Sequence, residues 1–517
     1  MINLKSLIKW TLNILLILGI LFLIFVLFVN GELKKMYGGK TKEVTTPAYL
    51  PDPEEVIAIE NVNVLSPNAD SIYYDKTVLI KQGKIEIVAD SLLITEGTAI
   101  IDGNGKYLIP GLIDQHIHFW QSPNDLLLYI ANGITTVGEL KGSDYHLRWR
   151  DEIEAGKRLG PHLFVTTTKI QSKGFFAGAF LNWTQGDIIL NNPQEAKGVL
   201  EGLKKEGYDG VKIGTFLSEE CYIAINKAAE DLDWLVTGHI PLRMDLENVW
   251  ASNQTNIAHI EEFVKHLNRE FGYVHKDNKD EFLAHVEKRG EEIAQKLVAS
   301  NISVTTTLWL MESFARQRKD IEAELASVQL KYANPGLLEG SFIAKGALGW
   351  LPNVNRYKPS SKLSEEEFFN DQAYWKTYAK ANQMLVRIFN EYSVEIIAGT
   401  DANVPTAVPG FSFHNELVSM SQQGMSPSQV LRSATFKPAQ WMKKNCGKIE
   451  RGYVADLVLL NANPLEDIRN TTKIETVILG DKIFYRDQLD EMLEAVENAN
   501  NETRRVRIDQ YLSLENN

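Results

Sequence analysis

Residues 110–118 read PGLIDQHIH, a short apolar run that ends in two histidines one residue apart. In an extended chain, side chains two positions apart point to the same side, so His116 and His118 can both reach one metal ion. Seven more short β-branched runs follow and alternate with longer amphipathic stretches. This alternation is typical of an α/β fold, and eight such units are the number in a (β/α)8 TIM barrel.

The barrel is predicted to cover residues 111–445, beginning with a strand at residues 112–114. The other predicted strands are residues 133–137, 163–166, 210–213, 234–237, 256–258, 303–307 and 395–398. The segment between the last two is too long for one connection. We therefore predict a helical insertion over residues 311–392, above the barrel mouth.

Short strands separated by turns lie on both sides of this region. Lys84–Val88 belongs to the first flank, residues 55–110, and Ala455–Leu460 to the second, residues 446–485. Strand-rich flanks of this kind predict one small β-sandwich built from both. Residues 486–517 are predicted to form a charged helical tail.

The N-terminus contains a run that is long enough to cross a membrane. Trp10–Val29 is 20 residues without a charge, and a helix of that length spans about 30 Å, the thickness of a hydrocarbon core. A core helix would show a polar face, which this run lacks. A cleaved signal peptide is the alternative, but the run is long and Phe28–Gly31 is a poor cleavage site. We expect an uncleaved transmembrane helix over residues 1–30 and a tether over residues 31–54.

The orientation of this anchor is not decided by charge, because lysines stand on both sides of the apolar run. A short flank before a single span and a large folded body after it favour export of the body. We therefore predict a membrane-anchored protein whose catalytic domain is periplasmic or extracellular.

Composition excludes several classes of protein. Of the 517 residues, 44% are hydrophobic and 23% charged, as in globular proteins and unlike disordered, collagenous or coiled-coil chains. Lys and Arg number 54 against 67 Asp and Glu, a net charge of −13, so nucleic acid is not an expected partner. Two cysteines, Cys221 and Cys446, exclude a disulfide framework and a cysteine zinc site.

Six side chains at predicted strand ends carry the expected chemistry, because functional groups in such barrels stand at the C-terminal ends of strands. They are His116, His118, Lys212, His239, His259 and Asp401. Each alone has an ordinary structural interpretation: a histidine can be hydrogen-bonded in the core, the lysine exposed, and the aspartate a helix cap. Together, in this order, they indicate a metal site. Asp114, which could orient His116 or His118 from behind, and His414, after the eighth strand, are weaker candidates.

The motifs resemble those of the amidohydrolase superfamily. PGLIDQHIH is similar to the segment that opens the superfamily barrel, Gly399-Thr400-Asp401 resembles its last metal-binding strand, and GYVADLVL (residues 452–459) resembles its return to the sandwich. The resemblance covers about residues 55–485. Lys212, in VKIG, points toward the binuclear branch with a carboxylated lysine, in particular its imidazolonepropionase-like and Xaa-Pro dipeptidase-like members. Residues 166–170 lack the Gly-His-rich segment of the dipeptidase-like members.

This resemblance implies a ligand set for two divalent metal ions. His116, His118 and Asp401 would hold one ion, and His239 and His259 the second. Lys212, carboxylated by CO₂, would bridge them, since a carbamate is anionic and has two oxygens. Zinc is the default for histidine and carboxylate ligands, although manganese, cobalt and iron are chemically admissible.

The resemblance also implies an enzyme. Two ions about 3.5–4 Å apart would hold a bridging hydroxide, with Asp401 as the general base and acid that passes a proton to the leaving nitrogen. We predict an amidohydrolase that cleaves a C–N bond in a small molecule such as a dipeptide or N-acyl compound. The same site could serve cyclic amides, imidazolones or esters. A non-catalytic membrane-tethered binding protein is the remaining alternative, but it would have lost ligands. The sequence leaves the oligomeric state open, a homo-oligomer included.

Overall fold

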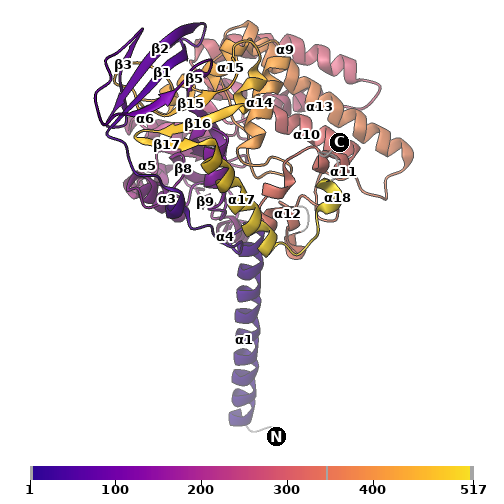
Figure 1. Cartoon of the computed structure of the whole chain (residues 1–517). Helices are drawn as coiled ribbons and strands as arrows, with labels where there is room; N and C mark the ends of the chain where they lie inside the picture. The colour runs from indigo at the N-terminus through magenta and orange to yellow at the C-terminus, as the bar shows by residue number, and fades with distance from the viewer. Residues whose placement is uncertain (1–3, 345–346, 513–517) are drawn as a thin grey trace.

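A computed structural model describes residues 4–344 and 347–512, and Figure 1 shows a mixed α/β body from which one long helix protrudes. The body contains two parallel sheets and one larger mixed sheet. The parallel sheets hold the strands predicted for the barrel, and the mixed sheet holds the strands of the two flanks.

The first parallel sheet has the order β11-β10-β8-β7-β6, with β9 beside β8. Its strands are β6 (Leu112–Ile117), β7 (Ile134–Glu139), β8 (His162–Gln171), β9 (Ile188–Ile189), β10 (Gly210–Ile213) and β11 (Leu235–Gly238). Every residue of β6, β7 and β10 is buried. Burial on both faces explains why these strands read as continuous apolar and β-branched runs.

The second parallel sheet has three strands in the order β12-β13-β14. They are β12 (Asn256–Ile257), β13 (Ser303–Thr305) and β14 (Ile396–Ile397). Backbone hydrogen bonds join the two sheets at both edges: Ala258 N donates to Gly238 O (2.9 Å), and Gln115 N donates to Ala398 O (3.2 Å). All eight predicted strand segments are therefore strands in the structure.

Helices lie between and after these strands. In the first part of the body they are α2 (Asp125–Ala131), α3 (Asp144–Glu154), α4 (Phe175–Gln185), α5 (Ala196–Glu206), α6 (Glu219–Asp231), α7 (Leu246–Trp250), α8 (Glu261–Phe271) and α9 (Lys279–Ala299). Between β13 and β14 the chain forms α10 (Leu308–Lys319), α11 (Ile321–Ala326), α12 (Pro335–Glu339) and α13 (Glu365–Glu391). The long segment predicted as an insertion is thus helical over most of its described length.

The chain ends in a further set of helices. They are α14 (Phe411–Gln422), α15 (Pro427–Ser433), α16 (Phe436–Trp441), α17 (Arg486–Thr503) and α18 (Asp509–Leu512). Short 3-10 turns lie at Thr46–Tyr49, Pro193–Glu195, Leu330–Tyr332, Phe342–Ala344 and Ile468–Thr472. The predicted C-terminal tail is helical in α17 and α18, and its residues 513–517 lie outside the described residues.

The flanks form one mixed sheet in the order β17-β16-β15-β5-β1-β2-β3, with β4 beside β1. Its strands are β1 (Val56–Leu65), β2 (Ile72–Lys81), β3 (Lys84–Ala89), β4 (Ala99–Asp102), β5 (Tyr107–Pro110), β15 (Leu457–Leu460), β16 (Ile474–Leu479) and β17 (Lys482–Tyr485). Pairing of β5 with β15 joins the flanks.

Both flanks contribute strands to this sheet, as predicted, while its description as a sandwich stays a prediction. The start of β3 lies next to the segment that leads into β15: Ile85 N donates to Tyr453 O (3.0 Å), and Ala455 N donates to Gly83 O (2.9 Å). Hydrogen bonding is continuous through β5, so one sheet folds over a core of its own.

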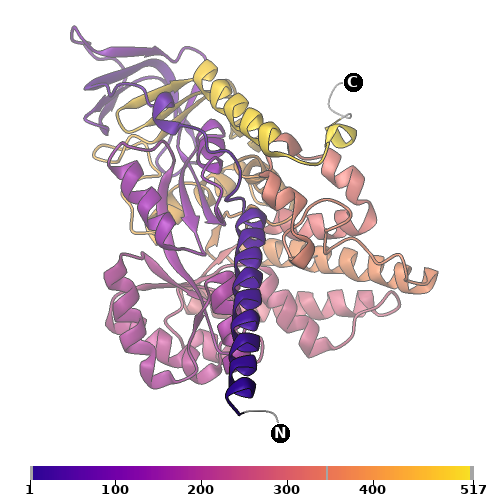
Figure 2. The same ribbon diagram turned by 90° about the horizontal axis from the view of Figure 1, so that it is seen from below.

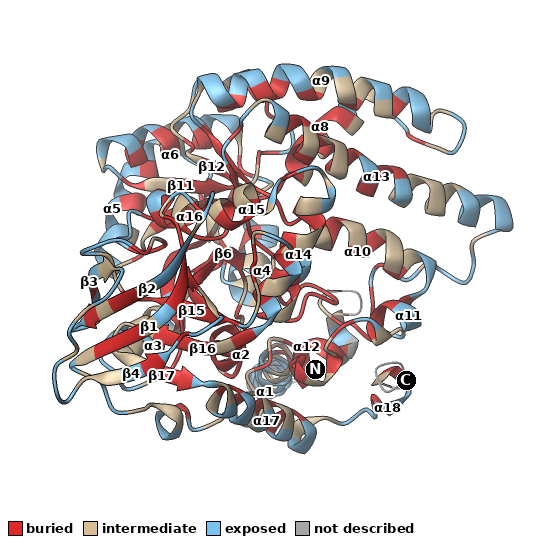
Figure 3. Ribbon diagram, turned by 45° about the horizontal axis from the view of Figure 1, so that its top comes forward, coloured by how far each residue is buried: buried red, intermediate tan, exposed pale blue. Residues whose placement is uncertain are grey.

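The N-terminal helix α1 (Leu4–Met36) is long and almost entirely exposed where it is apolar. Ile8–Met36 is apolar and long enough to cross a membrane, with 6% of its most apolar window buried. In Figure 3 the strands of the parallel sheets are mostly red, whereas α1, viewed nearly end on, is pale blue. In the view from below, α1 stands in front of the body, because it protrudes from the lower side (Figure 2).

Burial along α1 begins at Val29, which is 8% exposed. The helix continues to Met36, so the first part of the predicted tether is helical. Glu32 accepts a hydrogen bond from Ser341 Oγ (2.9 Å), and the Tyr37 ring stacks on Trp120 at 4.9 Å. The segment after the apolar run is therefore packed onto the body.

Candidate metal centre

The six predicted side chains stand at or just beyond strand ends of the two parallel sheets. His116 lies near the end of β6 and His118 follows it, Lys212 lies in β10, His239 follows β11, His259 follows β12, and Asp401 follows β14. We call these six residues the rim cluster. His116 and Lys212 are almost fully buried, whereas the side chains of His118 and Asp401 each keep 14% exposure.

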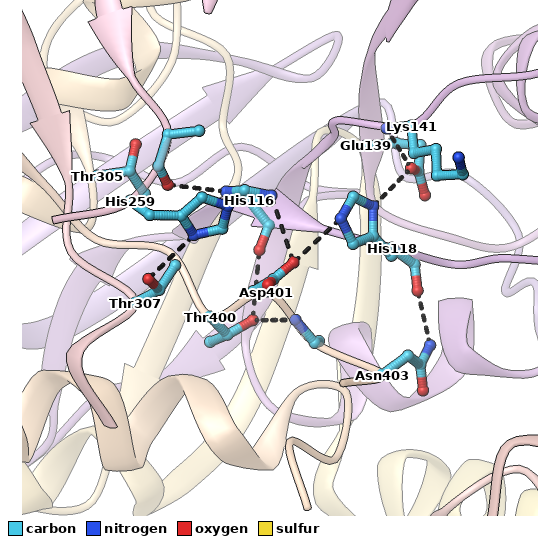
Figure 4. A network of polar contacts seen from close by, with 12 residues as sticks. His116, His118, Glu139, Lys141, His259, Thr305, Thr307, Thr400, Asp401 and Asn403 are labelled. Carbon is cyan, nitrogen blue, oxygen red and sulfur yellow. Dashed lines mark hydrogen bonds and ion pairs between the residues drawn. The ribbon is translucent and has the colours of Figure 1, made fainter. Parts of the chain in front are cut away.

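Asp401 lies at the middle of one half of this cluster. Its Oδ1 atom is 3.0 Å from His118 Nε2 and 3.4 Å from His116 Nε2. Figure 4 shows both imidazoles directed at the carboxylate. Lys212 Nζ lies 3.4 Å from His116 Nε2. Two imidazoles, an amine and a carboxylate therefore meet in one small volume.

His259 connects this group to the other half of the cluster. Its ring centroid is 4.4 Å from that of His116 and 5.1 Å from that of His239. One ligand atom each from His116, His259 and Asp401 lies within 4.8 Å of the others. The structure thus brings all six predicted residues into one continuous set of contacts.

The donor set fits a divalent ion. Among the described residues, no donor makes a hydrogen bond of acceptable geometry to Asp401 Oδ1, although this buried atom faces two imidazole nitrogens. A buried carboxylate oxygen that faces two imidazole nitrogens without accepting a hydrogen bond is expected where these atoms share an ion. Imidazole nitrogen and carboxylate oxygen are ligands that zinc prefers.

The outer nitrogen of each histidine in the cluster is held by a partner. The Nδ1 atoms contact Ala258 O (from His116, 3.0 Å), Glu139 Oε1 (from His118, 3.4 Å), Glu262 Oε1 (from His239, 2.9 Å) and Thr307 Oγ1 (from His259, 3.2 Å). Carbonyl and carboxylate oxygens only accept hydrogen bonds, so in the first three histidines Nδ1 carries the hydrogen and Nε2 presents its lone pair. This fixes the imidazoles as ligands that act through Nε2.

Glu139 and Glu262 are the functional residues that sequence reasoning missed. The Glu139 carboxylate also accepts from Phe119 N (2.6 Å) and Lys141 N (2.7 Å), and Glu262 accepts from Ile240 N (3.1 Å). Both side chains are fully buried. Glu139 ends a strand, which could have identified it, whereas Glu262 had the sequence position of a helix-capping residue.

Burial and neighbouring charges set the ionisation of the cluster. Burial lowers the pKa of His116 and His259 well below the ordinary value. Burial alone would lower the pKa of His118, but Asp401 and Glu139 raise it above the ordinary value. Burial would raise the pKa of Asp401, but His116 and His118 hold it well below its usual range. The carboxylate is therefore ionised at neutral pH.

Lys212 has an amine that loses its proton unusually easily. Burial lowers its pKa to about 7, against an ordinary value of 10.5. Its backbone N donates to Thr167 Oγ1 (3.0 Å), which fixes the strand register at this point. A large fraction of Lys212 is consequently a neutral amine near pH 7.

The structure explains the residue types at Gly399 and Asp401 in the segment Gly399-Thr400-Asp401. A Cβ on Gly399 would lie 3.0 Å from His116 Cβ and 2.5 Å from Thr305 Cγ2, so no larger residue fits. Asp401 has a φ of 55° and donates its backbone N to His116 O (2.8 Å). This left-handed conformation, rare for a non-glycine residue, turns the carboxylate toward the histidines.

The two weaker candidates occupy different places. Asp114 accepts from Thr400 Oγ1 (2.7 Å), Thr400 N (3.1 Å) and His116 N (3.3 Å), so it fixes the backbone around the cluster and contacts neither imidazole through these bonds. His414 lies in α14, where its nitrogens bond to Thr471 Oγ1 (3.0 Å) and Asn132 O (3.1 Å). The structure does not bring His414 to the rim cluster.

Comparison with known proteins gives both family and structural matches. The chain matches the model described as "Amidohydrolase family" over residues 107–484. It is 46% identical over 65 residues to imidazolonepropionase of Idiomarina loihiensis, an alignment that covers 12% of this chain and 16% of that protein. The chain therefore matches only a small part of this curated relative.

Two solved structures share the fold. A Xaa-Pro dipeptidase with bound methionine superposes with a TM-score of 0.60 at 19% identity, covering 83% of this chain and 100% of the other. A bottromycin amidohydrolase gives 0.65 at 18% identity, covering 90% and 96%. At such identities the likeness concerns the fold.

Proposed function

The chain belongs to the amidohydrolase family, and on that premise we propose that it is a metal-dependent hydrolase that cleaves an amide C–N bond in a small substrate. The family expected from PGLIDQHIH is confirmed. The observation that carries the proposal is the convergence of the six rim-cluster side chains, with the outer nitrogen of every histidine held by a partner.

Two divalent ions, zinc by default, would be held by these residues. His116, His118 and Asp401 would hold one, and His239 and His259 the other. Such ions, when bound, polarise a carbonyl and lower the pKa of water. Glu139 and Glu262 keep His118 and His239 in the orientation that binding requires.

Lys212 would bridge the two positions as a carbamate. The neutral amine attacks the carbon of CO₂, an N–C bond forms, and one proton is released. Because the pKa of Lys212 is lowered to about 7, the neutral amine needed for this reaction is abundant at physiological pH. The product is an anion with two oxygens, which suits a position among imidazoles.

Asp401 would move the proton. Its carboxylate is ionised because His116 and His118 hold its pKa low, so it can accept a proton from the attacking water. The water oxygen bonds to the carbonyl carbon, and Asp401 returns the proton to the leaving nitrogen as the C–N bond breaks. The products are a carboxylate and an amine.

The scaffold and location belong to the same proposal. We infer that the two parallel sheets, bonded at both edges, form a closed (β/α)8 barrel with the rim cluster at its C-terminal face. We also propose that α1 is an uncleaved transmembrane anchor and that the body is periplasmic or extracellular. The length and exposure of the apolar run support this.

Open-chain amides, such as dipeptides and N-acyl compounds, are the preferred substrate class. Cyclic amides are the second candidate, supported by the local 46% identity to an imidazolonepropionase. The two can be separated with full-length protein supplied with zinc and bicarbonate. We expect faster hydrolysis of p-nitroanilides, dipeptides and N-acyl amino acids than of cyclic amides, and no hydrolysis by Asp401→Asn. Protein that retains no divalent metal, or equal turnover by the variant, would refute the proposal.

A further inference from the structure

Helix α4 presents an unusual surface. Its sequence, FFAGAFLNWTQ, contains no charged residue, and of its 11 residues only Gly178 is buried. Phe175, Phe176 and Phe180 are 82%, 85% and 58% exposed. We call Phe175, Phe176, Phe180 and Trp183 the aromatic patch. Large contiguous apolar surfaces of this kind mark sites that meet another apolar phase.

The aromatic patch is tied to the end of the apolar run of α1. Trp183 Nε1 donates to Asn30 Oδ1 (2.9 Å), and Tyr37 Oη donates to Thr184 O (2.9 Å). Asn30 is two residues beyond Phe28, or about 3 Å along a helix axis. Figure 1 shows α4 at the base of the body, beside the point where α1 joins it. The patch therefore lies at the level where α1 would leave a bilayer.

A cavity of about 600 Å³ is lined by residues of both α1 and α4. Its walls include Asn30 and Leu33 of α1, Trp183 of α4, and Trp120 and Lys141. The Trp120 ring is 5.5 Å from that of His118. Lys141 N donates to Glu139, the carboxylate that holds His118. Two residues of the cavity wall therefore lie next to His118 or its partner Glu139, although no rim-cluster side chain lines the cavity itself.

We propose that α4 is an interfacial helix that lies in the same bilayer as α1, so that the cavity between them receives amide substrates with an apolar chain directly from the membrane. The membrane contact rests on the proposed anchor, and the substrate class rests on the proposed hydrolase. Interfacial helices bury an apolar face about 5–10 Å into the boundary between headgroups and acyl chains. Aromatic side chains such as Trp183 are enriched at that depth.

A bilayer is the occupant that the contacts favour. The patch is continuous with α1, whose side chains from Ile8 to Phe28 are almost all exposed, as a membrane span requires. The absence of charge from α4 matches an acyl phase. A protein partner or a second copy of this chain would cover the patch without lipid contact, and the experiment below separates these cases.

The membrane contact can be tested with single labels in the full-length protein. The native Cys221 and Cys446 are buried, so a cysteine at an exposed position can be labelled selectively with an environment-sensitive fluorophore. Phe176→Cys reports on α4, Phe22→Cys (67% exposed) on α1, and Tyr74→Cys (60% exposed, in β2) serves as the matched control. Each labelled protein is placed in phosphatidylcholine vesicles with or without brominated acyl chains.

We expect bromine to quench the labels at residues 176 and 22 and to leave the label at residue 74 unchanged. Quenching at residue 22 alone would overturn the role of α4 while the anchor stands. Quenching at residue 176 in a chain that has lost residue 22 by cleavage would support α4 and refute the anchor. If the label at residue 176 showed blue-shifted fluorescence without quenching, it would be in contact with protein, and the proposal would be overturned. Quenching at neither residue 176 nor residue 22 would also overturn the proposal.

The substrate class is tested by kcat/KM for N-acyl amino acids of one headgroup in the same vesicles. We expect kcat/KM to rise at least about tenfold between acetyl and dodecanoyl chains, because each buried CH₂ group adds binding free energy. Phe176→Glu should lower the ratio of kcat/KM for the dodecanoyl compound to kcat/KM for the acetyl compound. Phe369→Glu, which replaces a 55% exposed phenylalanine in α13, should leave this ratio unchanged.

Equal values for the two chains, or a ratio unchanged in Phe176→Glu, would overturn the route from the membrane. Hydrolysis of neither compound would refute the substrate class together with the proposed function. The label measurements do not require hydrolysis and would still decide the position of α4.

Discussion

The rim cluster and the aromatic patch depart from ordinary protein surfaces and interiors in opposite ways. The first places imidazoles, carboxylates and an amine in the interior, and the second leaves large apolar side chains outside. Buried polar groups and contiguous exposed apolar groups are the arrangements that require a reason. In the rim cluster the buried groups can contact one another and bind an ion. In the aromatic patch the apolar side chains can be covered only by a phase or a molecule outside the chain.

Substitutions in the two regions should therefore have different effects. Loss of a rim-cluster residue should affect chemistry and metal content, and loss of a patch residue should affect membrane contact and the access of substrate. Neither should greatly affect folding of the body.

Lys212→Ala should empty at least one metal position and reduce turnover to below detection while the fold persists. The substitution removes the only side chain proposed to bridge the two ions, and alanine offers no ligand. Metal per chain is measured by elemental analysis and folding by circular dichroism. Lys169→Ala, one strand away at the register partner of Lys212, is the control. Full metal content in Lys212→Ala would show that the lysine is not a bridge.

Asp401→Asn should lower kcat by about 10³-fold, because it removes both a ligand and the group that transfers the proton. Steady-state kinetics on the best amide substrate measures this effect. Asp233→Asn, in which the carboxylate is 92% exposed, should leave kcat unchanged. A kcat within tenfold of the parent, in protein with normal metal content, would exclude Asp401 as the proton acceptor.

Much of the rim cluster could be predicted from the sequence because its residues stand at ends of strands whose pattern is strong. PGLIDQHIH is an apolar strand followed by ligands, and Gly399-Thr400-Asp401 combines a glycine forced by close packing with a strained aspartate. Such local constraints leave a local pattern. The eight strand segments were predictable for the same reason, since burial on both faces selects β-branched residues.

Other features depend on contacts between distant parts of the chain and could not be predicted in this way. Glu262 follows His259 closely, yet its partner is His239, 23 residues earlier. The sequence predicted that the two flanks share one β unit, but it could not predict that pairing of β5 with β15 makes their hydrogen bonding continuous. The exposure of α4 is a property of the packed molecule, and its apolar sequence alone reads as an ordinary buried helix.

Glu262→Gln should weaken metal binding by about 10- to 100-fold, since a partner of this kind orients a ligand and raises its basicity. Glu261→Gln is a matched control, because this neighbour bonds to Lys265 and Tyr378 instead of a histidine. Competition with a chelator measures the affinity in both variants. Equal affinities would indicate that His239 is held by its strand alone, and the rim cluster would then extend less far than its hydrogen bonds suggest.

The smallest expected effect concerns the aromatic patch and the stability of the body. Phe176→Ser should change the free energy of unfolding by less than about 0.5 kcal/mol, because an exposed side chain loses little on truncation. Phe263→Ala, at a fully buried position, should instead lower it by about 3–5 kcal/mol. Denaturant titration of both full-length variants in one detergent gives the comparison. If Phe176→Ser destabilised the protein as much as Phe263→Ala, the patch would pack against the body, and its apolar surface would need no membrane to explain it.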